Sequence, residues 1–66
     1  MPSDETRRLL KMFGVAVTAY EDAVQNKSSI QEILESETEA RARLHEVTAL
    51  IDRLHAVASH AEPTNG

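Results

Sequence analysis

The chain has 66 residues with no cysteine and no tryptophan, and its 11 acidic residues outnumber its 7 lysines and arginines, for a formal net charge of −4. A chain of this length forms one small domain, and without cysteine it has neither disulfides nor thiolate metal ligands to stabilise it. With 2 glycines and 2 prolines it lacks the frequent turns of a β-sandwich or barrel, so the composition indicates an all-α protein.

The first predicted helix covers about residues 3–26. Ser3 or Asp4 serves as its cap, and acidic residues fill the first turn, where the positive end of the helix dipole favours them. Apolar residues then recur at alternating steps of four and three, which is one face of a helix. A second line beside the first makes this face wider than a single neighbouring helix covers. The main line is Leu9, Phe13, Ala16, Tyr20 and Ala23, and the second line is Leu10, Val17 and Val24.

A second helix is predicted over about residues 29–60, after a polar connection of two to five residues. Ser29 with Glu32 forms a capping box, and Ser28 with Gln31 offers another in the adjacent register. A connection this short makes the flanking helices antiparallel neighbours. The second helix keeps a coiled-coil heptad along its length, with two seam lines in which all but one residue is apolar. These lines are Ile30, Glu37, Leu44, Ile51 and Ala58, and Ile33, Ala40, Val47, Leu54 and Ala61.

The segment around Glu37 leaves an alternative open. Glu37 is the polar seam residue, and Ser36 with Glu39 is itself a capping box. A break near residues 36–38 would produce a three-helix monomer in place of a hairpin. In either case we expect residues 1–61 to form the helical domain and residues 62–66 to form a flexible C-terminal tail.

The helix lengths predict self-association. At 1.5 Å per residue the two helices are about 36 Å and 48 Å long, so residues near the end of the second helix extend past the start of the first. If residue i of the first helix faces about residue 54 − i of the second, as a turn at residue 27 implies, then Ile51, Leu54, Val57 and Ala58 lie in this extension. A homodimer in which two hairpins form a four-helix bundle covers such side chains. The residues expected at the oligomer or partner interface are Leu9, Phe13, Val17, Tyr20, Leu44, Val47, Ile51, Leu54 and Val57.

Candidate chemistry is sparse in the sequence. His45, His55 and His60 are ten and five residues apart, whereas two ligands on one helix face need a spacing of three or four, so we expect no metal site and no cofactor. The string from Arg41 to Leu50 resembles the phosphoacceptor helix of sensor histidine kinases, which dimerise through helical hairpins. That resemblance implies that His45 is a phosphoacceptor assisted by Glu46, and phosphotransfer is one alternative function.

Nucleic-acid binding is a second alternative, because a helical hairpin dimer with a basic face can bind phosphates. The antiparallel arrangement brings five basic residues into one region of the hairpin: Arg7, Arg8, Lys11, Arg41 and Arg43. The favoured interpretation is a non-enzymatic interaction module that binds a protein partner as a small regulator, adaptor or assembly factor. The sequence has no apolar run of the roughly 20 residues that a membrane span needs, and its N-terminal region does not match a secretory signal. We therefore expect a cytoplasmic protein without membrane contact.

Overall fold

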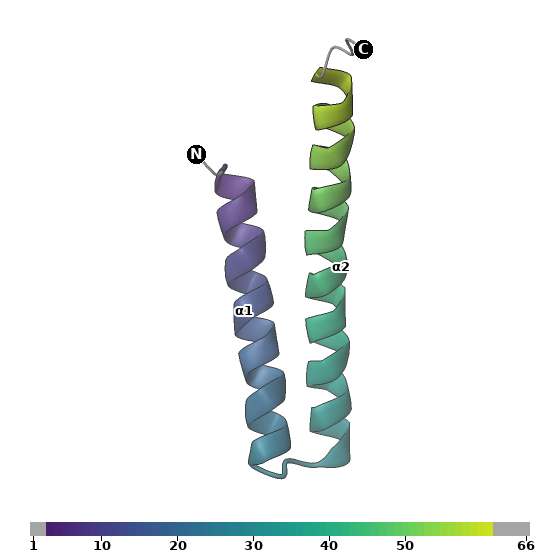
Figure 1. Ribbon diagram of the computed structural model, residues 1–66. Helices are drawn as coiled ribbons and strands as arrows, with labels where there is room; N and C mark the ends of the chain where they lie inside the picture. Colours follow the sequence, from purple (N-terminus) through teal and green to yellow (C-terminus); the bar gives the residue numbers. More distant parts are fainter. Residues whose placement is uncertain (1–2, 62–66) are drawn as a thin grey trace.

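The computed structural model describes residues 3–61, which form two antiparallel helices joined by a short turn (Figure 1). Helix α1 spans Asp4–Gln25 and helix α2 spans Ile30–Ala61. The predicted all-α hairpin is confirmed, and each helix end lies within one residue of its predicted position. The tail predicted at residues 62–66 lies outside the described residues.

Local hydrogen bonds explain where α1 begins and ends. Ser3 is the N-cap, and its hydroxyl oxygen accepts a hydrogen bond of 3.1 Å from the backbone N–H of Thr6. At the other end the N–H of Ser28 donates to the carbonyl of Ala23 at 3.0 Å, and the N–H of Lys27 donates to the carbonyl of Val24 at 3.2 Å. This pair of bonds is the Schellman motif. It places Lys27 in the left-handed region, with φ of 56°.

Helix α2 starts at the first of the two predicted caps and continues without a break. The N–H of Glu32 donates to the Ser29 hydroxyl oxygen at 3.2 Å, so the Ser29 register is the one used. Near residues 36–38, where a break was considered, the Ser36 hydroxyl donates to the backbone carbonyl of Glu32 at 2.9 Å. The Thr38 hydroxyl likewise donates to the backbone carbonyl of Leu34 at 2.9 Å. These polar side chains bond within the helix instead of capping a new one. The three-helix alternative is therefore wrong.

The contact between the helices is narrow and contains few large side chains. Ala16 of α1 and Ala40 and Leu50 of α2 are its buried residues, with Leu50 only 7% exposed. Half-buried apolar side chains complete the contact: Leu9, Phe13, Tyr20 and Ala23 from α1, and Ile33 and Val47 from α2. Small residues at positions 16 and 40 let the two backbones approach closely along the middle of the hairpin.

The heptad lines of α2 divide between the contact with α1 and the side of the hairpin. The line through Ile33, Ala40 and Val47 is buried or half-buried against α1, as a seam line should be. The other predicted seam line is largely exposed, with Leu44 48% and Ile51 58% accessible. The line that completes the contact is instead Ser36, Arg43 and Leu50, which are half-buried or buried.

An ion pair fixes the level of one helix against the other. Arg53 of α2 donates to the carboxylate of Glu5 on α1 at 2.8 Å. Residue i of α1 therefore lies at about the same height along the hairpin as residue 58 − i of α2. The expected relation of 54 − i is therefore wrong by about one helical turn. Ile51 is level with Arg7 and is exposed because it lies on the side of the hairpin. Figure 1 shows α2 continuing past the start of α1, and Val57 and Ala58 lie on that extension.

Candidate interaction surface

One side of the hairpin carries a line of apolar side chains from each helix. Val17 of α1 and Leu44 of α2 line the same shallow groove there, and the rest of its lining is Phe13, Tyr20, Ala40 and the charged pair Glu37 and Arg41. Residues seven apart occupy nearly the same face of a helix, so the lines through Val17 and Leu44 continue along the hairpin in both directions. We call this surface the apolar flank and define it as Leu10, Val17, Val24, Ile30, Leu44 and Ile51.

Every member of the apolar flank is accessible to solvent. Their exposed fractions run from 39% for Val17 to 69% for Ile30. Fully burying such a side chain contributes about 1.5–3 kcal/mol, so each half-exposed member could contribute about 1 kcal/mol more if it were covered. Apolar residues that are aligned along one surface mark an interaction site more often than scattered ones do.

The opposite side of the hairpin is dominated by ion pairs. Arg43 bonds to Glu39 at 2.8 Å and to Glu46 at 3.0 Å, and Arg53 bonds to Glu5 across the helices. The hydrogen bonds that Arg43 donates to the carboxylates of Glu46 and Glu39 raise the pKa of Arg43 above its usual value. We call this surface the charged flank and define it as Glu5, Glu39, Arg43, Glu46 and Arg53. Met12 and Val15 also line it, so this flank mixes ion pairs with exposed apolar side chains.

Glu37 is the one acidic residue in the Leu44 line of the apolar flank. Its carboxylate accepts a hydrogen bond of 2.9 Å from Arg41 one turn later, and its side chain is 28% exposed. The pair is local to α2, since both residues belong to the same helix. Glu37 therefore interrupts the apolar line near its middle without joining α1 to α2.

The residues predicted at an interface fall into three groups in the structure. Four are half-buried between α1 and α2: Leu9, Phe13, Tyr20 and Val47. Three belong to the apolar flank: Val17, Leu44 and Ile51. Two lie at the open end of α2: Leu54, 55% exposed and level with Asp4, and Val57, 63% exposed. The residues predicted at the interface did not include Leu10, Val24 and Ile30. Their spacing could have identified them, since Leu10 and Val24 are seven residues from Val17, and Ile30 is fourteen residues from Leu44.

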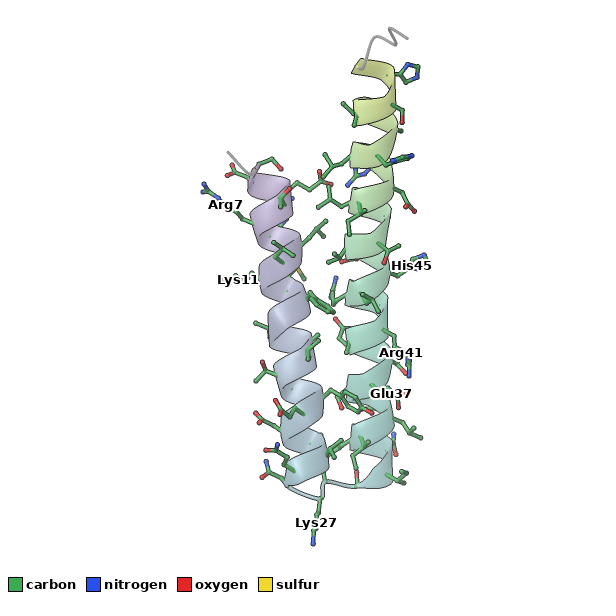
Figure 2. All side chains as sticks on the ribbon, viewed as in Figure 1. Arg7, Lys11, Lys27, Glu37, Arg41 and His45 are labelled. Atoms are coloured by element: carbon green, nitrogen blue, oxygen red, sulfur yellow. The ribbon has the colours of Figure 1, made fainter. Side chains whose placement is uncertain are left out.

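The structure does not gather the predicted basic patch into one surface. Figure 2 shows Arg7 and Lys11 on the side of α1 that faces away from α2, whereas Arg41 lies on the far side of α2. Arg41 and Arg43 are two residues apart, which separates them by about 200° around the helix. Each of these two arginines is also paired with glutamate in its own helix.

The three histidines lie on the exposed surface of α2. His45, His55 and His60 are all exposed, and Figure 2 shows His45 on the outer side of α2. Glu46, the acid that the kinase resemblance assigns to His45, is bonded to Arg43. Within residues 3–61 no three metal-binding side chains come together. Neither described helix has an apolar stretch sufficient to span a lipid bilayer.

Comparisons with known proteins give no family for this chain. It matches no protein-family model, no curated protein and no solved structure.

Proposed function

We propose that this protein is a non-enzymatic helical interaction module that self-associates through its apolar flank. Two hairpins would pair into a homodimeric four-helix bundle, and the dimer would act on a protein partner as a regulator, adaptor or assembly factor. We propose that the protein acts in the cytoplasm, the location expected from its sequence.

The observation that carries the proposal is the exposure of the six apolar-flank residues along both helices. A hairpin of two helices can bury only the sides that face each other, and here that contact encloses Leu50 as its one large buried side chain. A chain of this size seldom stabilises itself with so few buried side chains unless an oligomer or a partner completes its core. Covering the apolar flank supplies the missing burial.

The dimensions of the hairpin suit this role. It extends 55 × 20 × 13 Å, so its broad face has room for the roughly 800 Å² that each partner buries in a standard stable interface. Stacking two such faces makes each helix an antiparallel neighbour of a helix in the other copy, which is the arrangement of a four-helix bundle. The charged flank and the outer faces of the helices stay accessible to a further protein.

A dilution series followed by amide NMR tests the proposal. Val17 and Val15 are a matched pair of residues, since both are exposed valines of α1 on opposite flanks. Self-association through the apolar flank predicts that the amide signals of Val17 and Leu44 change with protein concentration while that of Val15 stays constant. Spectra that do not depend on concentration, or changes centred on Val15, would overturn the proposal.

A further inference from the structure

We infer that the apolar flank is covered by a second copy of this chain lying antiparallel to the first, with the turn of each hairpin against the open end of the other. The inference rests on the proposed self-association and adds its orientation. Two arrangements bring the apolar flanks together. In the parallel one both turns lie at the same end of the bundle, and in the antiparallel one they lie at opposite ends.

Charge separates the two arrangements, because the hairpin is strongly polarised along its length. The half that contains the turn, residues 18–40, carries six acidic residues against one base, Lys27. The open half, residues 3–17 and 41–60, carries six basic residues against four acidic ones. A parallel dimer places two acidic halves side by side, whereas an antiparallel dimer places each acidic half against a basic one. Like charges in contact oppose association and opposite charges favour it.

The relative heights of α1 and α2 along the hairpin also favour the antiparallel dimer. Because Glu5 is level with Arg53, Gly14 is level with Leu44, and these residues lie close to the midpoints of Asp4–Gln25 and Ile30–Ala61. A two-fold axis at this level, perpendicular to the helices, therefore aligns α1 with the other α1 and α2 with the other α2 over their whole lengths. Leu44 meets its own counterpart at the axis.

This alignment also covers the apolar side chains at both ends of α2. Positions equally far from Leu44 lie opposite each other, so Ile30 of one copy lies beside Ala58 of the other, and Glu37 lies beside Ile51. The extension of α2 past the start of α1, on which Ala58 continues the line through Leu44 and Ile51, then lies against the part of α2 near the turn, where Ile30 is 69% exposed. In the parallel arrangement the extension passes beyond both α1 helices and remains largely uncovered.

Spin-label distances distinguish the orientations. The chain has no cysteine, so Ser59→Cys and Lys27→Cys each introduce one label site in an exposed position. Ser59 is fifteen residues from Leu44, and at 1.5 Å per residue two Ser59 labels in the antiparallel dimer are about 45 Å apart. At the opposite end, Lys27 is thirteen residues from Gly14, which is level with Leu44, so two Lys27 labels are about 40 Å apart. In a parallel dimer each pair lies within about 25 Å, because neighbouring helix axes are about 10 Å apart.

Double electron–electron resonance on the two labelled full-length variants is the deciding measurement, with helicity by circular dichroism as the check on folding. Long distances for both sites support the antiparallel dimer. Short distances for both overturn the orientation while leaving self-association in place. An absence of any intermolecular distance at high protein concentration overturns the proposed self-association itself, so the two failures are distinguishable. As an independent readout, the antiparallel dimer weakens when salt is added, and a dimer that tightens with salt contradicts it.

Discussion

Replacing Ile51 with glutamine separates the stability of the dimer from that of the hairpin. Ile51 is 58% exposed and belongs to the apolar flank, so most of its side chain contributes nothing to the contact between α1 and α2. Glutamine is uncharged, is similar in length and favours helix, so Ile51→Gln leaves the hairpin intact. In a dimer formed through the apolar flank, the same change puts a polar amide into a buried position.

The expected loss follows from the exposed part of the side chain. Burying about half of an isoleucine contributes roughly 1–1.5 kcal/mol, and the glutamine amide gains no such burial. A symmetric dimer contains the substitution twice, which brings the total loss to about 2–3 kcal/mol. At 1.4 kcal/mol for each factor of ten, the dissociation constant rises about 30- to 100-fold.

Thermal melts followed by circular dichroism at several protein concentrations measure this effect. The melting temperature of a dimer rises with concentration, whereas that of a monomer does not. We expect the original chain to show that rise and Ile51→Gln to lose it. The matched control is Val15→Gln, which changes a valine that is 62% exposed on the opposite flank and should keep the rise. Equal behaviour of the two variants would refute the assignment of the interface to the apolar flank.

Three further changes test the hairpin itself. Lys27→Gly should stabilise the fold by about 0.5–1 kcal/mol in urea melts, because it relieves a lysine at φ of 56°; a loss of stability would contradict the role given to the left-handed turn. Leu50→Ala should cost about 2–4 kcal/mol, since Leu50 is the largest buried side chain, and a cost below about 1 kcal/mol would count against that packing. Glu37→Leu should raise the melting temperature by completing the apolar line, and a clear fall would show that the pair with Arg41 outweighs apolar burial.

The helices and their ends were predictable because each depends on local sequence. The alternation of apolar residues by three and four identifies both helices, and Ser3 and Ser29 cap them as expected. The form of the turn was not predictable from composition, since a Schellman motif usually has glycine where this chain has Lys27. Its hydrogen bonds depend on backbone geometry that lysine tolerates at a cost.

The sides of the hairpin were harder to predict because the apolar face of α2 is wider than one neighbour. Periodicity shows that the lines through Leu44 and Val47 are adjacent but not which of them packs on α1. The line that completes the contact contains Ser36 and Arg43, whose polarity argues against a core position. Arg43 occupies it by covering the contact with its aliphatic stem while its guanidinium reaches Glu39 and Glu46 at the edge.

The predicted basic patch depended on the same missing information. An antiparallel hairpin brings Arg7 and Lys11 to the level of the α2 arginines, but level alone does not determine the side on which each points. The structure directs them to different sides of the hairpin (Figure 2). Nothing in the spacing of single charged residues fixes that direction before the inward line of each helix is known.

Sedimentation equilibrium of the full chain over a wide range of concentrations tests the central claim most directly. The account predicts a mass that rises with concentration to twice that of one chain, and a lower mass for Ile51→Gln under the same conditions. A particle that keeps the mass of a single chain at every concentration, while remaining fully helical, would contradict it.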